Sequence, residues 1–311
     1  MITRGYEALH EGAALVDLTG RGKIRLAGED RARLLHAMTT NHVNELKPAH
    51  GLYAFFLNAQ GRVLADVNVW NMGESFLLDT EPESATLVYQ HLDKFIIADD
   101  VALSDETEGT ATWYVEGPSA GSVMESAGFP GPAEQYGSIE GNGVMTAKVN
   151  GIFIFCPMAE KEAVADRLRL AGAVDATAGD FLVYRLEQHR PRHGVDFGEA
   201  QIPQETQQMQ AIHFSKGCYL GQEIVERVRS RGHVNRQLVL LNVDGSNIPA
   251  AETKIFSGDK EVGEITSAAF SPRQDNVLAF GYVRTEAIRN QAPLVVGEAA
   301  AKIIEDGKGN V

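Results

Sequence analysis

The stretch FSKGCYLGQEIVERVRSRG, from Phe214 to Gly232, combines one of the chain's two cysteines with a lysine and several arginines. Residues 221–228 have the spacing of a helix, and Gly232 is a suitable helix stop. Cys218 therefore lies in a glycine-flanked loop ahead of a helix N-terminus and close to Lys216, and both features favour a thiolate. The stretch predicts a reactive or ligand-facing thiol. The alternative is a small buried side chain, the usual fate of a free cysteine.

The arginines of this stretch alternate along the chain. Arg227, Arg229 and Arg231 are spaced by two, and Arg236 follows. A solvated helix face is the ordinary outcome for such a run. Residues spaced by two do not share one helix stripe, however, so one or two of these arginines are expected to point inward. An inward guanidinium needs an anionic partner, such as a carboxylate or phosphate.

The whole chain is acidic. It has 311 residues, a net charge of −14, 44% hydrophobic and 23% charged residues, which is typical of a globular protein with two or three domains. The negative charge argues against broad nucleic-acid binding. No apolar run approaches the roughly 18 residues of a membrane span, and the N-terminal residues lack the pattern of a secretory signal. We therefore expect no membrane association and a cytoplasmic location.

Metal sites and disulfides are not expected from the sequence. Cys156 and Cys218 are the only cysteines and have no paired spacing, which argues against a disulfide scaffold and a cysteine zinc site. No histidine pair has the spacing of a helical metal site with a supporting carboxylate. The segment GRGKIRLAG lacks the order of residues that a phosphate-binding loop requires, so it does not predict a phosphate site.

A strand–turn–helix pattern occurs twice along the chain. Residues 23–40 have this pattern, residues 52–70 that of a hairpin, and residues 75–98 that of a strand followed by a helix beginning near Pro82. Residues 111–128 and 152–172 repeat the order. This recurrence suggests an internal duplication of an α+β unit, with chance similarity as the alternative.

The C-terminal part has a different texture. Residues 179–197 predict a helix that ends near Pro191. Beyond Gly232, short strands separated by Gly, Pro and Asp turns predict a small β-barrel. The predicted domains are residues 1–232, with two α+β subdomains, and residues 233–311, the barrel.

Two carboxylates stand out from these elements. Asp66 lies on the strand face opposite Val63, Ala65 and Val67. If that face is solvated, Asp66 is an ordinary surface residue; if both faces are covered, it is a buried carboxylate that must have a partner. Glu187 lies within a predicted helix, between apolar and basic residues, where a surface glutamate is the alternative to a binding residue.

The octapeptide KGCYLGQE resembles the signature of the YgfZ-type folate-binding proteins. These are relatives of the glycine-cleavage T-protein, an aminomethyltransferase, and are linked to iron–sulfur cluster assembly or repair. Similar blocks occur at residues 34–70, 184–197, 263–272 and 278–284, so the resemblance extends over nearly the whole chain. The signature positions in this chain are Lys216, Gly217, Cys218, Tyr219, Gly221, Gln222 and Glu223.

The resemblance implies an α+β, aminomethyltransferase-like cloverleaf. Two related α+β subdomains and a small C-terminal β-barrel would surround a central channel for tetrahydrofolate or a one-carbon derivative. Glu187 matches the glutamate that binds the pterin, whose adjacent amino and ring N–H groups one carboxylate can accept. Asp66 matches the aspartate near the reactive folate nitrogen. Arg227 and Arg236 match basic positions that could meet the folate tail, and Tyr219 is assigned to the same binding set.

Cys218 separates two branches of this superfamily. T-proteins typically carry an acidic residue at this position, and a cysteine there marks the YgfZ-type branch. The resemblance implies catalytic roles for Cys218, Lys216 and Asp66. It favours a folate-binding accessory protein for iron–sulfur enzymes, with client or assembly proteins as partners. The alternatives are a folate-dependent aminomethyl or methyl transferase, and an interaction module that has lost its ligand.

Overall fold

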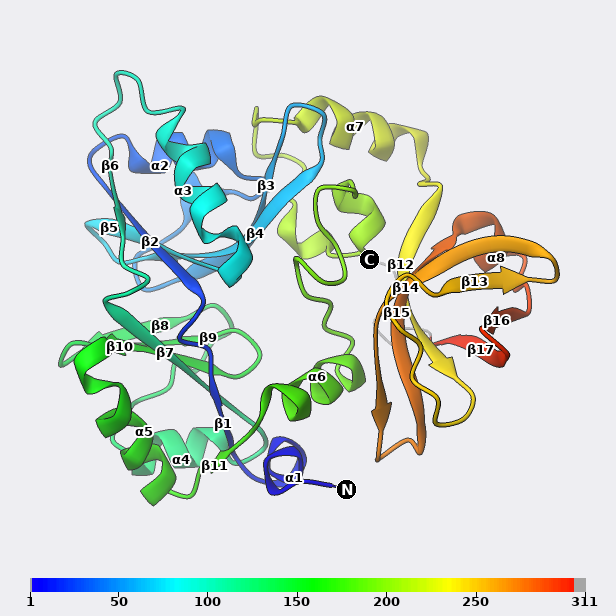
Figure 1. The fold of residues 1–311 in the computed structure, drawn as a ribbon. Coiled ribbons are helices and arrows are strands. Elements are labelled where there is room, and N and C mark those ends of the chain that lie inside the picture. The colour runs from blue at the N-terminus through cyan, green and yellow to red at the C-terminus, as the bar shows by residue number, and fades with distance from the viewer. Residues whose placement is uncertain (1, 305–311) are drawn as a thin grey trace. The chain divides into compact units, whose positions relative to one another are not determined.

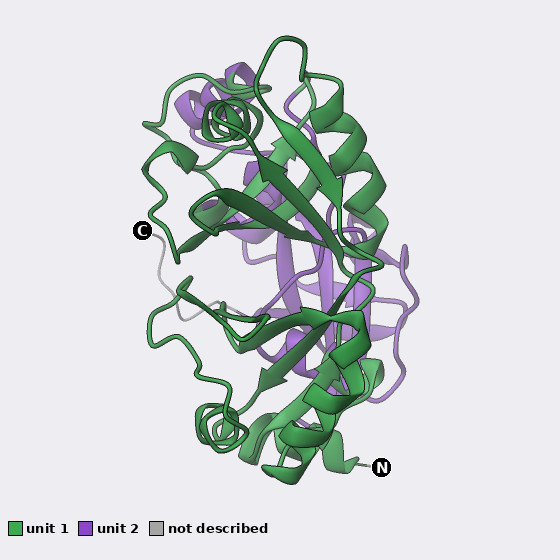
Figure 2. Ribbon diagram, turned by 90° about the vertical axis from the view of Figure 1, so that its left-hand side faces the viewer, with its two compact units in different colours: residues 1–60, 64–181, 210–222 green, residues 61–63, 182–209, 223–311 purple. Residues whose placement is uncertain are grey.

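The computed structural model describes residues 2–304. These residues form two compact units, shown in two colours in Figure 2, and neither unit is a single stretch of chain. Unit 1 comprises residues 1–60, 64–181 and 210–222, and unit 2 comprises residues 61–63, 182–209 and 223–311. A domain boundary after residue 232 stays a prediction, and residues 305–311 of the predicted barrel domain lie outside the described range.

Unit 1 begins with a helix and a five-stranded sheet. Helix α1 (Arg4–Glu11) is capped by the Thr3 hydroxyl, which accepts a hydrogen bond from the Tyr6 amide. The sheet has the order β3-β4-β5-β2-β6. Its strands are β2 (Gly22–Ala27), β3 (Gly51–Leu57), β4 (Val63–Asn71), β5 (Ser75–Thr80) and β6 (Ala102–Asp105). The strand–turn–helix predicted at residues 23–40 and the hairpin predicted at 52–70 are confirmed (Figure 1).

Helices α2 (Arg31–Met38) and α3 (Ala85–Asp93) cover one face of this sheet. Leu35 and Val88 of the helices share one apolar core with Ile24 of β2, and all three are fully buried. Pro82 lies in the 3-10 turn η2 (Pro82–Ser84) immediately before α3, as predicted. A second 3-10 turn, η1 (Val43–Glu45), follows α2.

A six-stranded sheet completes unit 1, with the order β11-β1-β7-β10-β9-β8. Its strands are β1 (Ala14–Asp17), β7 (Thr110–Glu116), β8 (Ser138–Gly141), β9 (Val144–Lys148), β10 (Ile152–Pro157) and β11 (Val174–Asp175). Helices α4 (Ala120–Ser126) and α5 (Lys161–Leu170) pack on one face through a common apolar core, and η3 (Met158–Glu160) precedes α5.

The two sheets of unit 1 repeat one connectivity. The order β3-β4-β5-β2 in the first sheet corresponds to β8-β9-β10-β7 in the second, with one helix after β2 or β7 and another after β5 or β10. The predicted recurrence of elements is therefore present. Its origin by duplication stays a prediction.

The two sheets pack against each other through their other faces. Trp70 and Leu77 of the first sheet share an apolar cluster with Tyr114, Phe153 and Phe155 of the second. Unit 1 is thus layered helix, sheet, sheet, helix, as the green ribbon in Figure 2 shows. Side chains between the sheets are largely covered by protein, so a polar group that is buried there needs a protein partner.

Unit 2 contains a closed six-stranded barrel. Its strands follow the order β12-β15-β14-β13-β16-β17. They are β12 (Arg236–Val243), β13 (Lys254–Ser257), β14 (Lys260–Ser271), β15 (Asn276–Arg284), β16 (Leu294–Val296) and β17 (Ala299–Ile304), with helix α8 (Thr285–Arg289) after β15. The predicted strands and barrel are confirmed. The other elements of this part of the chain are α7 (Gln222–Arg231), η4 (Pro203–Thr206) and η5 (Met209–Ala211).

Helix α6 (Ala178–Glu187) ends earlier than the prediction near Pro191. His189 adopts a left-handed backbone with φ of 55°. The amide of His189 donates to the carbonyl of Leu186, and the amide of Arg190 donates to that of Arg185. This is a Schellman closure, which ends the helix before the proline is reached. Among residues 2–304, no helix is long and apolar enough to cross a membrane.

Gly51 provides a test of the packing within unit 1. A Cβ added to Gly51 would lie 2.4 Å from Cε3 of Trp70, whose side chain is fully buried. We expect Gly51→Ala to lower the free energy of unfolding by about 1–3 kcal/mol, because the indole cannot move without overpacking the layer. Urea unfolding followed by circular dichroism measures this change.

Gly121→Ala is the matched control. Gly121 lies in α4, where an added Cβ meets no atom within 4 Å. Alanine is the better helix former, so this variant should gain up to about 1 kcal/mol. Wild-type stability of Gly51→Ala would mean that β3 can shift away from the indole.

Candidate functional site

Asp66 lies on β4, on the face that carries Asn68 and Trp70 and packs between the two sheets. That face of β4 is covered, as in the second alternative from the sequence, although the Asp66 side chain as a whole is only partly buried. Oδ2 of Asp66 accepts a hydrogen bond of 2.9 Å from the hydroxyl of Tyr53 on β3. Oδ1 is buried and has no hydrogen-bond partner among the described residues.

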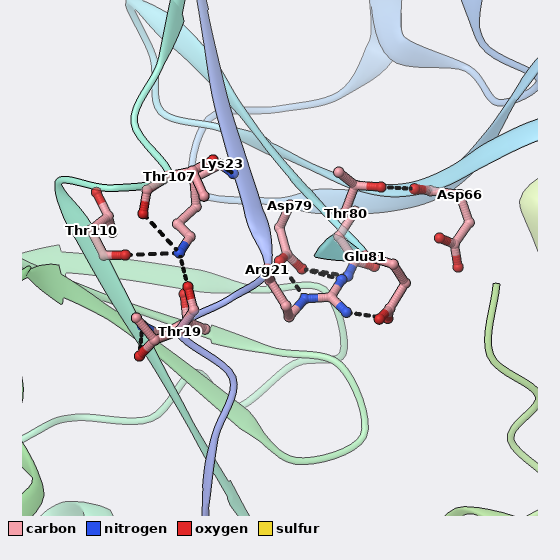
Figure 3. Close-up of polar contacts among 11 residues, drawn as sticks. Thr19, Arg21, Lys23, Asp66, Asp79, Thr80, Glu81, Thr107 and Thr110 are labelled. Carbon is pink, nitrogen blue, oxygen red and sulfur yellow. Dashed lines mark hydrogen bonds and ion pairs between the residues drawn. The ribbon is translucent and has the colours of Figure 1, made fainter. Parts of the chain in front are cut away.

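Two further carboxylates and one guanidinium lie near Asp66 (Figure 3). Nε and Nη2 of Arg21 donate to Oδ1 and Oδ2 of Asp79, at 2.6 and 3.1 Å. Nη1 of Arg21 donates to Oε1 of Glu81. The Asp79 side chain is fully buried, and Asn68 Nδ2 donates to its Oδ2 at 2.9 Å. Asp79 is therefore the carboxylate that is best supplied with donors.

The pKa of Asp66 reflects this unequal supply. Burial, and after it the negative charge of Glu81, raise the pKa of its carboxyl to about 7. Arg21 opposes both effects, but its guanidinium bonds to the other two carboxylates. At neutral pH Asp66 is therefore poised between acid and carboxylate.

Lys23 does not neutralise this cluster by a direct bond. Lys23 pairs with Asp79 across strands β2 and β5, yet its Nζ donates to the carbonyls of Thr19 at 2.7 Å and Thr110 at 2.8 Å. Burial lowers the pKa of Lys23 to about 8. Figure 3 shows its nitrogen directed toward these carbonyls.

Lys216 anchors the signature segment to α2. Its Nζ donates to the carbonyls of His36 and Thr39 at the C-terminal end of that helix, and Nε2 of His36 lies 2.9 Å from the carbonyl oxygen of Lys216. The ammonium also lies 4.9 Å from the ring centre of Tyr219. Burial lowers the pKa of Lys216 to about 7. These contacts assign Lys216 a role in holding the segment, whereas its predicted catalytic role stays a prediction.

The two cysteines have opposite environments. Cys218 is exposed, between Gly217 and Gly221, which have φ of 96° and 83°. Such angles strain any residue with a Cβ, so the glycines permit the turns around the thiol. Cys156 is buried in β10, and burial raises the pKa of its thiol to about 11. Tyr219 is buried, and the last two signature residues, Gln222 and Glu223, begin α7.

In unit 2, Glu187 is the last residue of α6, and Ser271 Oγ donates to its Oε1 at 2.5 Å. Arg236, at the start of β12, is partly buried; its Nε donates to Glu205 Oε1 at 3.4 Å, and its guanidinium lies 4.9 Å from the ring centre of Tyr282. Arg227 is exposed on α7. The one inward arginine of the predicted run is therefore Arg236, and its partner is a carboxylate of the protein itself.

The predicted site residues fall into separate groups. Asp66 belongs to the carboxylate cluster of unit 1, and Lys216 and Tyr219 contact each other in the signature segment, while Glu187, Arg227 and Arg236 belong to unit 2. Sequence reasoning missed Arg21, Asp79 and Glu81. Asp79 carried a signal, as a charged residue inside the apolar strand SFLLDT. No sequence signal pointed to Arg21, because the only pattern around it, GRGKIRLAG, suggests a phosphate-binding loop and lacks the required order.

Comparison with known families identifies the chain. Residues 1–136 match the GCVT N-terminal domain, and residues 236–304 match the glycine cleavage T-protein C-terminal barrel domain. The chain belongs to the glycine-cleavage T-protein family. This confirms the T-protein part of the resemblance, whereas assignment to the YgfZ-type branch stays a prediction.

Relatives of this family member span nearly its full length. An aminomethyltransferase from Rubrobacter xylanophilus is 27% identical over 293 residues, which is 90% of this chain and 78% of the relative. A chloroplastic protein from Arabidopsis thaliana, named as a candidate transferase, is 25% identical over 312 residues, covering 96% of this chain and 72% of the relative. Since that relative is a chloroplast protein, a cytoplasmic location for this chain stays a prediction.

A solved structure confirms the predicted fold class. The crystal structure of glycine cleavage system aminomethyltransferase T from Bartonella henselae matches with a TM-score of 0.89, over 98% of this chain and 88% of that chain. The sequence identity is 19%, so this likeness concerns the fold alone. The chain is a mixed α+β protein with an aminomethyltransferase-like fold and a closed C-terminal barrel.

The raised pKa of Asp66 predicts a pH-dependent cost to stability. The carboxyl binds its proton more tightly in the folded chain, where its pKa is about 7, than at its ordinary value of 3.8. The contribution of this proton to the free energy of unfolding is complete below about pH 4 and is lost as the pH rises through about 7. Asp66→Asn, which stays uncharged, should therefore gain stability over wild type between these pH values and keep that gain above pH 7. Urea titrations at pH 4, 6 and 8.5 measure the difference, and a difference that is constant with pH would contradict the shift.

The cysteines predict a selective reaction with iodoacetamide. At pH 8, limiting reagent should label Cys218 well before Cys156, because Cys218 is exposed and Cys156 is buried with a raised pKa. Mass spectrometry of the digested protein measures the ratio. Cys218→Ser serves as the control and should be labelled slowly on the folded chain but readily in urea. Faster labelling of Cys156 than of Cys218 would contradict the assignment.

Proposed function

We propose that this chain is a tetrahydrofolate-binding accessory protein that supports iron–sulfur cluster assembly or repair in client enzymes. The observation that carries the proposal is an exposed cysteine within the KGCYLGQE signature of a chain with both glycine-cleavage T-protein domains. The family supports a folate ligand, and the signature cysteine supports the accessory branch. Cys218 would then act as a thiol in the open segment that Lys216 anchors.

Glu187 and Asp66 are the residues that we assign to the pterin. Glu187 ends α6, where one carboxylate could accept both the amino group and the ring N–H of the pterin edge. Asp66 would lie near the reactive folate nitrogen. Arg227 is the basic residue left exposed for the folate tail, whereas Arg236 would have to share its guanidinium with Glu205. Tyr219 completes the proposed set as a ring beneath the signature segment.

A second function is a folate-dependent aminomethyl transfer of the T-protein type. It is favoured by the name of the Rubrobacter relative, an aminomethyltransferase that matches over most of both chains. The two functions differ in the reaction and in the need for the thiol. Cys218→Ser should leave a transferase active but should remove the accessory function if the thiol is used.

The experiment that separates them uses one purified sample in two assays. The accessory function predicts that the wild-type chain restores iron–sulfur enzyme activity in cells lacking their own protein of this type, and that Cys218→Ser does not. It also predicts no useful release of ammonia from an aminomethyl-loaded carrier protein with tetrahydrofolate. Rapid release of ammonia, unaffected by Cys218→Ser, would establish the second function instead.

Folate binding predicts an effect of Glu187→Gln. The amide puts an NH₂ donor where the pterin requires an acceptor, which should cost about 1–3 kcal/mol, or roughly 5–150-fold in affinity. Calorimetric titration with tetrahydrofolate under reducing conditions measures the change. Glu298→Gln, at an exposed barrel position, is the control and should bind as wild type does. Equal affinities of Glu187→Gln and wild type would remove Glu187 from the site.

A further inference from the structure

The loop that carries Cys218 is held to the end of α2 on both of its sides. Before the loop, Nζ of Lys216 donates to two carbonyls at the end of this helix, and the Lys216 carbonyl oxygen lies 2.9 Å from Nε2 of His36. After the loop, the amide of Leu220 donates to the carbonyl of Ala37 at 3.1 Å. The two anchors therefore lie on the same turn of α2, and the cysteine loop spans the distance between them.

His36 is hydrogen-bonded at both of its ring nitrogens. The amide of Asn44, in η1, donates to Nδ1 of His36 at 3.3 Å, so Nδ1 has to accept. A neutral imidazole that accepts at one nitrogen carries its hydrogen on the other. Nε2 of His36 is therefore the N–H that donates to the Lys216 carbonyl. A proton on Nδ1 would set a second N–H against the amide of Asn44, so the bridge from η1 through His36 to Lys216 requires an uncharged ring.

Three histidines lie together at this end of α2. The ring centres of His36 and His42 are 4.8 Å apart, and those of His42 and His213 are 5.0 Å apart, with each pair edge to face. The amide of Ser215 donates to Nδ1 of His213 at 3.3 Å. Two of the three rings thus accept a backbone N–H at Nδ1, and each loses that hydrogen bond when it takes up a proton.

The charged groups around these rings oppose a charge on His36. Lys216 acts on it from the signature segment, and Arg33 lies one turn earlier on α2, paired with carboxylates outside the cluster. Glu45 of η1 lies 3.6 Å from Nε2 of His42, but its side chain is exposed. The C-terminal end of a helix attracts positive charge, yet Lys216 already bonds to its carbonyls. Burial, and after it the charges of Lys216 and the other two rings, lower the pKa of His36, against the opposing effect of its hydrogen bond to the Lys216 backbone.

We propose that His36 is a positioning residue for Cys218: its uncharged ring bridges η1 to the backbone of Lys216 and holds the cysteine loop, and a proton on the ring loosens that loop. The proton ends the hydrogen bond from Asn44. It also places a positive charge beside the ammonium of Lys216, which donates to the His36 carbonyl. The use of a fixed thiol in iron–sulfur repair rests on the proposed function, whereas the bridge is a property of the free protein.

The state of the His36 ring can be read by NMR. Nitrogen and carbon shifts of labelled histidine rings, recorded from pH 8 to about pH 5, give the tautomer and the midpoint, and His36→Gln assigns the signal. We expect the Nε2–H tautomer and a midpoint below the ordinary value of 6.5. His213→Gln removes a positive charge at low pH and should raise that midpoint. A His36 ring with its hydrogen on Nδ1, or a midpoint above 6.5, would overturn the proposal.

A nitroxide label on Cys218 reports the loop. A methanethiosulfonate spin label reacts with the exposed thiol, and its electron paramagnetic resonance spectrum measures how freely the loop moves. In the wild-type chain the mobile fraction should rise as the pH falls through the His36 midpoint. His36→Gln keeps an N–H for the Lys216 carbonyl and takes up no proton, so its spectrum should stay constant with pH. His36→Leu has no donor and should be mobile at every pH.

His10→Gln is the matched control. His10 lies in the last turn of α1, where its ring contacts Tyr6, so this variant removes one histidine without touching the bridge. Its spectrum should change with pH as the wild-type spectrum does. A wild-type loop whose mobility is constant with pH would contradict the proposal, and so would a His36→Gln loop that loosens as the wild type does. If circular dichroism shows that His36→Leu does not fold, the wild type and His36→Gln still decide the bridge.

Complementation then tests the use of the fixed thiol. His36→Gln should restore iron–sulfur enzyme activity in cells lacking their own protein of this type as well as the wild type does, and folded His36→Leu should restore less than half as much. If Cys218→Ser restores full activity, the proposed use of the thiol fails while the spectra still decide the bridge. If the spectra support the bridge but folded His36→Leu restores full activity, the positioning role is wrong and the proposed function stands.

Discussion

Two sheets that pack face to face impose one constraint on unit 1: the side chains between them have little access to the bulk solvent that could supply hydrogen bonds. Most of that layer is apolar, built around Trp70, Tyr114 and Phe153. The polar side chains that enter it must find partners within the protein, and Arg21 is the only guanidinium bonded to carboxylates in the described cluster around Asp66. Burial and the charge of Glu81 raise the pKa of Asp66, and Arg21, which bonds to Asp79 and Glu81, offsets this only in part. The pKa of Asp66 therefore follows from how the two sheets pack and from which carboxylates Arg21 bonds to.

The signature segment contains an exposed loop that a buried lysine holds in place. Within unit 1, the Lys216 side chain donates to two carbonyls at the end of α2, which a helix leaves without partners. These contacts bury the ammonium of Lys216, and burial lowers its pKa to about 7. The thiol two positions later stays outside, between two glycines with positive φ. Anchor and reactive group are thus adjacent in sequence but have opposite environments.

Unit 2 presents its candidate residues at the ends of elements. Glu187 lies where α6 closes in a Schellman motif, and Arg236 lies where β12 enters the barrel. Residues at such ends are held by regular structure on one side and leave their side chains outside the core on the other. The neighbouring Arg185 has a structural use: Nη1 donates to Asp196 at 2.6 Å, and both side chains are buried. Within one short block, Arg185 pairs with Asp196 and Glu187 accepts a hydrogen bond from Ser271.

The sequence by itself determined the order of the elements, the barrel, the T-protein family and the identity of most candidate residues. Alternation, glycine turns and the KGCYLGQE octapeptide are local signals, and local signals survive in a single sequence. Only the tertiary structure decided that Oδ1 of Asp66 is buried, that Lys216 bonds to α2 and that Arg236 pairs with Glu205, because each depends on residues distant in the chain. Arg21 and Glu81 are 60 positions apart, and Arg21 and Asp79 are 58 apart. No spacing in the sequence links such residues; they meet because β2 and β5 are neighbours in one sheet, and the opposing sheet then excludes the water that would otherwise have made their charges unremarkable.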